Sequence, residues 1–255
     1  MAKKSRPQSA RQAKIDAVRK DSGGGANRIV VGAVVAIVAI VAVVGGVVIA
    51  ERNKQDRVGT STAVPAGASA MGEGFVANKD VTLVAGAPTL DIYEDFQCPA
   101  CAQFEQVMGG TVVELAQQGK VKLVYHLKTF LDANLRTTHS LTMGNAAMCA
   151  ADAGKFQAFH DAVYANMPAQ EGQGWTQAQV KGFAEGAGIA GGALEAWETC
   201  VDERKYATYV ESTEEASGKA GINSTPTVVL AGEKLDFNAV PDPAALKAAV
   251  EAATT

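Results

Sequence analysis

The chain has 255 residues, of which 47% are hydrophobic and 20% are charged, and this composition suits one globular domain with additional segments. The net charge of −4 is unevenly distributed: residues 1–28 carry eight Lys or Arg and two Asp or Glu, whereas residues 75–255 carry twelve Lys or Arg and twenty-two Asp or Glu. Because the larger segment is so acidic, it is poorly suited to binding nucleic acid, and we expect no nucleic-acid partner.

The first 74 residues predict a membrane anchor and a spacer. Residues 29–50 are 22 uncharged residues, and as a helix they would span about 33 Å, enough to cross the hydrocarbon core of a bilayer. Because the basic tail 1–28 precedes this transmembrane helix, we expect a single-pass protein of the cell membrane with a cytoplasmic N-terminus and an extracytoplasmic domain. Residues 51–74 are small and polar with Gly and Pro, and they predict a flexible linker.

A cleaved signal peptide is the alternative interpretation of this N-terminal segment. The basic part is long for a signal peptide, and the apolar run exceeds the length of about 7–15 residues that is usual there. The triplet Ala68-Ser69-Ala70 resembles a cleavage site, but it lies about eighteen residues beyond the run. These lengths favour an uncleaved anchor.

The domain from residue 75 onward begins with a strand–strand–helix–strand order. Val81–Val84 and Leu90–Asp95 predict the first two strands, separated by a Gly-Ala-Pro turn. A helix is expected from Cys98 to about Gln118, and Val121–Leu127 predicts the third strand. The second strand, the helix and the third strand form a βαβ unit, which indicates an α/β fold.

The second half of the domain differs from the first in its predicted secondary structure. Residues 134–220 predict helices only, and the chain returns to strand directly after Thr225-Pro226. A turn at 231–234 leads to a short pairing strand at Leu235–Phe237, and Pro243–Ala253 predicts a closing helix. The helical insertion therefore lies between the third and fourth strands.

Two cysteines stand where the first helix begins. In the motif CPAC, the i, i+3 spacing places the sulfurs of Cys98 and Cys101 on one face of the helix, close enough to form a disulfide. Pro99 suits the first helical position, because its missing N–H has no intrahelical partner there. Unpaired N–H groups and the positive end of the helix dipole favour the thiolate of Cys98. The motif therefore predicts an exposed, low-pKa Cys98 with Cys101 behind it, as thiol–disulfide exchange requires.

A zinc site and a purely structural CPAC disulfide are the alternatives. A CxxC zinc site needs a second pair of ligands at similar spacing, whereas His126, His139 and His160 form no ligand cluster in the sequence. An inert disulfide is not expected between a strand and a helix start. We therefore expect no metal in the domain.

The remaining cysteines, Cys149 and Cys200, both lie in predicted helices of the insertion. If Cys98 pairs with Cys101, these two are left to pair with each other, and an extracytoplasmic address makes that structural disulfide reasonable. Free buried thiols and a second redox relay are the alternatives.

The CPAC motif after a strand, followed later by Thr225-Pro226, resembles the DsbA-like thiol–disulfide oxidoreductases of the thioredoxin superfamily, in particular the membrane-anchored actinobacterial kind. The resemblance covers roughly residues 75–255 and implies a thioredoxin fold with a helical insertion. It further implies that Cys98 is the nucleophile and that Cys101 resolves the mixed disulfide. Pro226 would be a cis proline facing them, and the backbone of Thr225 would accept the substrate as an added strand.

The sequence departs from this family at two positions. Many members carry a buried acid six positions before the first cysteine, where this chain has Ile92; Glu94 and Asp95 are the nearby acids, and we expect them to be solvated. Ala100 stands where the enterobacterial prototype has a histidine that stabilises the thiolate. We therefore expect the pKa of Cys98 to lie below the free value of ~8.5 but above the ~3.5 of DsbA.

The resemblance implies a disulfide donor for reduced exported proteins. Reoxidation would come from a membrane partner of the DsbB or VKOR type, and no cofactor is implied. The first alternative is a membrane-anchored reductase or isomerase, which reverses the electron flow. The second is a copper(I) carrier using Cys98 and Cys101, which lacks an obvious third ligand.

Overall fold

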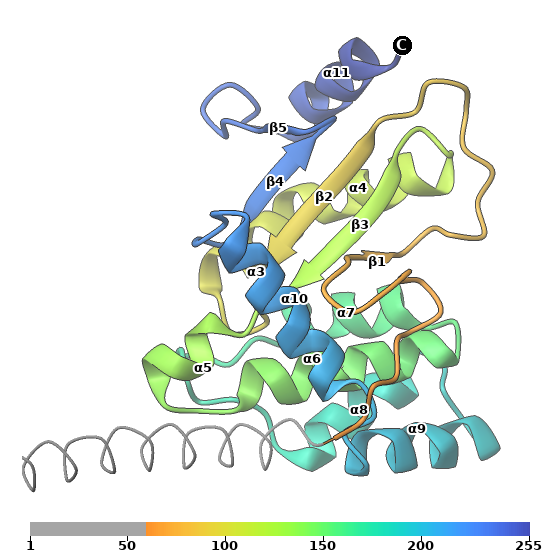
Figure 1. Ribbon diagram of the computed structural model, residues 1–255, viewed down its shortest axis with the longest axis vertical. Helices are drawn as coiled ribbons and strands as arrows, with labels where there is room; N and C mark the ends of the chain where they lie inside the picture. The colour runs from red at the N-terminus through yellow and green to blue at the C-terminus, as the bar shows by residue number, and fades with distance from the viewer. Residues whose placement is uncertain (1–59) are drawn as a thin grey trace, which may run out of the picture. The chain divides into compact units, whose positions relative to one another are not determined.

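The computed structural model describes residues 60–255; the predicted basic tail 1–28, the predicted transmembrane helix 29–50 and the first part of the linker lie outside them. Within residues 60–255, no helix is both long enough and apolar enough to cross a bilayer. A five-stranded sheet with the order β1-β3-β2-β4-β5 forms the centre of this unit (Figure 1). The strands are β1 (Phe75–Val76), β2 (Thr89–Glu94), β3 (Lys122–Leu127), β4 (Thr227–Leu230) and β5 (Glu233–Lys234).

The central strand β2 sets the register of the sheet. It runs parallel to β3, with Leu90 opposite Leu123, and antiparallel to β4, with Ile92 opposite Val228. Alternate residues of β2 are buried, as the two-residue period of a strand requires. Because Leu90 and Ile92 point into the core, the same alternation carries the carboxylate of Glu94 inward as well.

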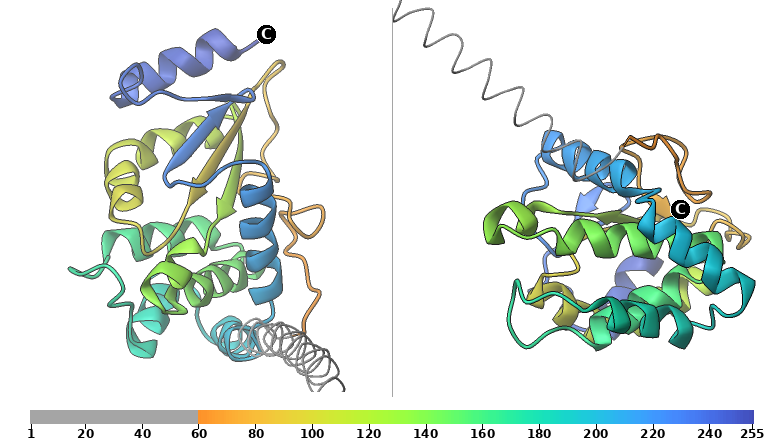
Figure 2. Two further views of the ribbon diagram at one scale, coloured as in Figure 1. Left: turned by 60° about the vertical axis from the view of Figure 1, so that its left-hand side comes forward. Right: turned by 90° about the horizontal axis from the view of Figure 1, so that it is seen from below.

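Helices cover both faces of the sheet and its lower end in Figure 1. The helix α10 packs on one face, whereas α4 and α11 lie on the other (Figures 1 and 2). The inserted helices gather beyond the carboxyl ends of β2 and β3, which confirms the predicted helical insertion (Figure 1). The helices are α3 (Pro99–Phe104), the π-helical turn η1 (Glu105–Gly109), α4 (Gly110–Gln117), α5 (Phe130–Leu135), α6 (His139–Asp152), α7 (Phe156–Ala165), α8 (Gln177–Gly186), α9 (Gly192–Asp202), α10 (Ala207–Lys219) and α11 (Pro243–Ala253).

A π-helical turn interrupts the helix that follows CPAC. The sequence predicts one continuous helix, but Glu105–Gly109 adopt π-helical hydrogen bonding between α3 and α4. Single π turns inside α-helices are rare and occur often at functional sites.

Two predicted strands are placed differently in the structure. The strand β1 is Phe75–Val76 rather than Val81–Val84, because the side chain of Asn78 bonds the backbone of Ala116, Val121 and Leu123 and leaves the following residues outside the sheet. The last strand is Glu233–Lys234 rather than Leu235–Phe237. Ala231 and Gly232 both have positive φ, and this pair closes a two-residue hairpin earlier than expected.

The end of the predicted linker 51–74 packs against the domain. The backbone N–H of Gly72 donates to Ser212 Oγ at 2.7 Å, and the hydroxyl of Tyr209 donates to the carbonyl of Glu73 at 2.7 Å. Gly74 lies so close to β3 that a Cβ there would be 2.4 Å from Val124 Cγ1. These contacts differ from the free spacer expected for this stretch, because its small residues permit a close approach to α10 and β3.

Cys149 of α6 and Cys200 of α9 form a disulfide with a Cα–Cα distance of 5.9 Å. Both cysteines are buried, and the neighbouring Trp197 donates its indole N–H to the carbonyl of Ala146 at 3.1 Å. The bond therefore joins two helices of the insertion, which lack a sheet to align them.

Candidate active site

The thiol of Cys98 lies at the start of α3. Cys98 is the N-cap residue, with extended backbone angles, and Pro99 is the first helical residue. Its Sγ is 3.6 Å from the carbonyl oxygen of Thr225. Cys98 is 8% exposed and Cys101 is fully buried, so Cys98 is less exposed than expected, whereas the neighbouring Pro99 and Ala100 are exposed.

The two thiols of the motif have opposite pKa shifts. The pKa of Cys98 is lowered to about 6, chiefly because the Cys101 thiol donates a hydrogen bond to the Cys98 thiolate. The side chain of Thr225 and the backbone N–H groups of Cys101 and Ala100 add to this effect, whereas burial opposes it. The pKa of Cys101 is raised, first by burial and then by the neighbouring Cys98 and the charge of Glu94. One thiol is therefore prepared to attack as a thiolate, while the other retains its proton.

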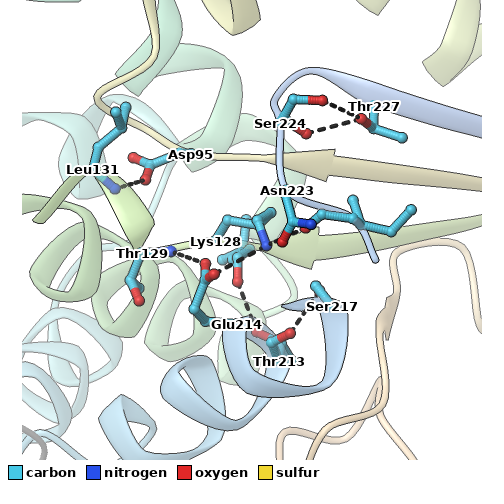
Figure 3. Close-up of polar contacts among 12 residues, drawn as sticks. Asp95, Lys128, Thr129, Leu131, Thr213, Glu214, Ser217, Asn223, Ser224 and Thr227 are labelled. Carbon is cyan, nitrogen blue, oxygen red and sulfur yellow. Dashed lines mark hydrogen bonds and ion pairs between the residues drawn. The ribbon is translucent and has the colours of Figure 1, made fainter. Parts of the chain in front are cut away.

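The peptide bond between Thr225 and Pro226 is cis, and it leads directly into β4. The loop before it is held by Lys128, which is 2% exposed: its Nζ donates to the carbonyl of Ile222 at 3.0 Å and pairs with Glu214 at 3.1 Å (Figure 3). The other carboxylate oxygen of Glu214 accepts the N–H of Thr129 at 2.8 Å. This network fixes the segment that faces Cys98.

A second network fixes the turn between β2 and Cys98. Asp95, expected to be solvated, is fully buried, and its carboxylate accepts hydrogen bonds from Ser140 Oγ at 2.6 Å, Gln97 N at 2.9 Å and Leu131 N at 3.2 Å. Burial raises its pKa to about 7 despite these bonds. The side chain of Gln97 donates in turn to Asp132 Oδ1 at 2.9 Å. The insertion thus supplies partners that hold the residues immediately before the reactive thiol.

Glu94 is also buried rather than solvated, because strand alternation directs it into the core. Its Oε1 lies 2.5 Å from Nε2 of His160, and both side chains are fully buried. Glu105 of the π-helical turn lies beside them, and the ligand atoms of these three residues lie within 4.8 Å of one another. The histidines of residues 60–255 do not cluster with one another, as the sequence predicts, but His160 joins two carboxylates from distant segments.

The sequence carried one signal for this cluster. His160 falls within the apolar spacing of α7, where Phe156, Phe159, Val163 and Tyr164 are all buried. A histidine on such a helix face must find a polar partner inside the core. No spacing rule could have identified Glu94 or Glu105 as that partner.

A small groove lies beside the CPAC motif. It has a volume of ≈ 140 Å³ and is lined by Gln97, Pro99, Trp175 and residues 167–172 with Gly174. Its lining includes the residues on either side of Cys98 in the sequence.

Comparisons with known proteins agree with this geometry. The thioredoxin family profile matches residues 84–252. Mycobacterium tuberculosis DsbA in its oxidised form is 27% identical, with 69% of this chain and 89% of that chain covered and a TM-score of 0.57. Reduced DsbG from Mycobacterium tuberculosis is 28% identical, with coverage of 69% and 85% and a TM-score of 0.57. The thiol–disulfide oxidoreductase MdbA from Actinomyces oris is 26% identical, with coverage of 67% and 83% and a TM-score of 0.57. No curated protein matches the chain.

The fold, the CPAC turn and the cis proline beside it therefore agree with the family profile, which covers most of the domain. The chain belongs to the thioredoxin family. Within that family it is a DsbA-like enzyme of dithiol–disulfide exchange.

Proposed function

We propose that this protein donates the Cys98–Cys101 disulfide to exported proteins outside the cytoplasm. The observation that carries the proposal is the difference between the two thiols: the pKa of Cys98 is lowered to about 6, while that of Cys101 is raised. A stabilised Cys98 thiolate favours the reduced form of the enzyme, and a favoured reduced form makes the disulfide a stronger oxidant.

The exchange proceeds in two balanced steps. A substrate thiolate attacks Sγ of Cys98, the Cys98–Cys101 bond breaks, and Cys101 leaves with the electron pair and takes up a proton. A second substrate thiolate then attacks the substrate sulfur of the mixed disulfide, and Cys98 leaves as the thiolate. The substrate is oxidised by two electrons and the enzyme is reduced by two.

Two surfaces beside Cys98 are suited to an extended substrate. The backbone of Thr225 would pair with the substrate chain as an added strand. The groove next to Pro99 would hold a substrate side chain near the reacting cysteine. Exposed Ala100 adds little bulk between these surfaces.

Residues 29–50 would anchor the enzyme in the cell membrane, with the basic tail 1–28 in the cytoplasm. The anchor would keep the domain near a membrane reoxidase of the DsbB or VKOR type, which would restore the disulfide. A membrane-impermeant thiol reagent applied to intact cells tests this topology: reduced Cys98 should be labelled, and protection until lysis would place the domain in the cytoplasm.

The reduction potential of the Cys98–Cys101 pair tests the direction of exchange. The full-length chain in detergent micelles would be equilibrated with glutathione buffers, and the oxidised fraction measured after alkylation of free thiols. A potential between about −120 and −180 mV is expected for a disulfide donor. A value near about −270 mV would make the protein a reductant and reverse the electron flow.

The roles of the two cysteines are tested separately. Cys101→Ser, mixed with a disulfide-bonded substrate, should accumulate mixed disulfides: the Cys98 thiolate attacks the substrate disulfide, one substrate sulfur leaves as the thiolate, and no Cys101 thiol is present to release the enzyme. Cys98→Ser should accumulate none and should lose exchange activity. Equal accumulation in the two variants would contradict the assignment of Cys98 as the attacked sulfur.

A further inference from the structure

The buried cluster of Glu94, Glu105 and His160 brings together three elements that are distant in sequence. Glu94 ends β2, Glu105 begins the π-helical turn, and His160 lies on α7. One oxygen or nitrogen atom from each lies within 4.8 Å of the other two. None of the three residues carries a sulfur, although the charge of Glu94 helps to raise the pKa of Cys101.

Three oxygen atoms around the cluster are buried without a hydrogen-bond partner. They are Oε2 of Glu94, Oε1 of Glu105 and the hydroxyl of Tyr164. Tyr164 is 7% exposed, and its ring meets that of His160 edge to face at a centroid distance of 5.0 Å. Although Glu105 as a whole is partly exposed, its Oε1 is buried. Unpaired buried oxygens are costly, and a bound species could supply the partner that these three atoms lack.

The charges of the cluster indicate that this species is a cation. His160 interacts with Glu94 through Nε2 and with Asp161 through Nδ1, at 3.0 Å in the second case. The carboxylate of Glu105 lies close by, so three carboxylates surround one imidazole. Burial raises the pKa of Glu105 to about 8, so at neutral pH its carboxyl holds a proton that a bound dication would displace. With that proton gone, three carboxylates face one imidazole, and a dication would balance their charge.

We propose that Glu94, Glu105 and His160 bind a divalent transition-metal ion of the zinc type. One imidazole nitrogen and two carboxylate oxygens are a donor set that zinc accepts. Asp161 accepts the other ring N–H of His160, as outer partners of metal-bound histidines usually do. The hydroxyl of Tyr164, or a water molecule beside it, would complete the coordination.

Binding needs small movements and the release of protons. Ligand atoms around a tetrahedral zinc ion lie roughly 3.3 Å apart. His160 Nε2 and Glu94 Oε1, which are 2.5 Å apart, must therefore separate, whereas Glu105 must move closer wherever its oxygen lies farther away, at most 4.8 Å from the other two atoms. The ion takes the place of the proton between His160 and Glu94 and of the proton on Glu105, and both protons pass to solvent.

An access route leads to the cluster. A groove of ≈ 840 Å³ runs between the helix after CPAC and α7, and Glu105, Asp161 and Tyr164 are among the residues that line it. An ion in this groove would meet the exposed part of Asp161 before it reaches the buried atoms.

Gly109 makes the position of Glu105 possible. A Cβ at Gly109 would lie 2.4 Å from Glu105 Oε2, whereas a Cβ at the neighbouring Gly110 would meet nothing within 4 Å. Both glycines have right-handed helical backbone angles that alanine adopts without strain. Gly109→Ala therefore displaces one proposed ligand without changing any ligand residue, and Gly110→Ala is its matched control.

The test measures zinc binding in the full-length chain in detergent micelles, with Cys98→Ser and Cys101→Ser present so that the CPAC thiols cannot bind the ion. Calorimetric titration with Zn²⁺ should give one ion per chain, and Co²⁺ should give visible absorption bands from an ordered site. In this background Gly109→Ala and Glu105→Gln should each weaken binding at least about tenfold. Gly110→Ala, and His126→Gln at the separate His126–Asp91 pair, should leave the affinity unchanged.

Two results would overturn the proposal. Loss of all binding when the CPAC thiols are removed would show that those sulfurs alone hold zinc. Equal affinity in Gly109→Ala and Gly110→Ala would show that the ion binds adventitiously on the acidic surface. Thermal unfolding of each variant without metal shows that its fold is intact, so weaker binding is attributed to the site.

Discussion

Cys98 Sγ lies 3.6 Å from the carbonyl oxygen of Thr225, although 127 positions separate the two residues in sequence. The thiol therefore has the amides of α3 on one side and the loop that leads to Pro226 on the other. Its chemistry depends on both, because the N–H groups of the helix start and the side chain of Thr225 lower the pKa of Cys98. The carbonyl of Thr225 accepts a hydrogen bond from the protonated thiol.

Removing the hydroxyl of Thr225 should raise the pKa of Cys98. Thr225→Val keeps the backbone and the shape of the side chain but removes a hydroxyl that favours the thiolate, so we expect the pKa of Cys98 to rise. Ultraviolet absorbance of the thiolate, followed against pH, measures it. Thr225→Ser retains a hydroxyl, so the pKa of Cys98 should stay at its wild-type value. An equal rise of that pKa in Thr225→Ser would show that the methyl group of Thr225 is responsible instead.

The stability of the reduced form should depend on pH through Cys98. Its pKa is about 6 in the folded state and ~8.5 in the unfolded chain, so the stabilisation is present above pH 8.5 and is lost as the pH falls through 6. Between about pH 6 and 8 the reduced form should gain roughly 1.4 kcal/mol per pH unit over the oxidised form. Guanidinium unfolding of the reduced and oxidised forms at several pH values measures this difference in the free energy of unfolding. If the two free energies changed with pH in the same way, the lowered pKa of Cys98 would be contradicted.

Ser140→Ala should destabilise the turn before Cys98. The lost bond to the carboxylate of Asp95 is charge-assisted once Asp95 ionises, so we expect a loss of about 1–3 kcal/mol in the free energy of unfolding at pH 8. Asp95 has a pKa of about 7, and below pH 5 its protonated form makes the loss smaller. Urea unfolding of the wild type and the variant at pH 8 and below pH 5 measures the loss in each case. An equal loss at the two pH values would show that Asp95 does not ionise between them.

Lys128→Met should weaken both stability and exchange. The substitution leaves Glu214 half-paired and frees the carbonyl of Ile222, so we expect a loss of about 3 kcal/mol in the free energy of unfolding. The exchange rate with a reduced protein substrate should also fall, because the loop before Pro226 loses its anchor. Lys247→Met removes an exposed ion pair with Glu114, which solvent screens, so it should lower the free energy of unfolding far less than Lys128→Met and leave the rate unchanged.

Replacing Cys149 and Cys200 by alanine should destabilise the insertion without changing the CPAC chemistry. The bond closes a loop with a separation of 51 residues, and its loss should lower the free energy of unfolding by roughly 2–4 kcal/mol. The potential of the Cys98–Cys101 pair should stay the same, since the two sites lie on different helices. A shifted potential would reveal coupling between the insertion and the active site.

Local patterns in the sequence determined the chemistry of this protein. CPAC lies within four consecutive residues at a strand-to-helix turn, so its geometry follows from neighbours along the chain. The βαβ order, the helical insertion and the helix Pro243–Ala253 follow from hydrophobic period and turn residues in the same way. Cys149 and Cys200 were left as a pair by elimination among four cysteines.

Only the tertiary structure decided the surroundings of that motif. Glu94, Glu105 and His160 meet because β2, a π-helical turn and α7 pack together, and no periodicity places three such segments in one cluster. Asp95 and Lys128 are buried because Ser140 and Glu214 come from the insertion to satisfy them. Burial of a charged group depends on partners distant in sequence, which is why sequence patterns assigned Glu94 and Asp95 to solvent and packing placed them in the core.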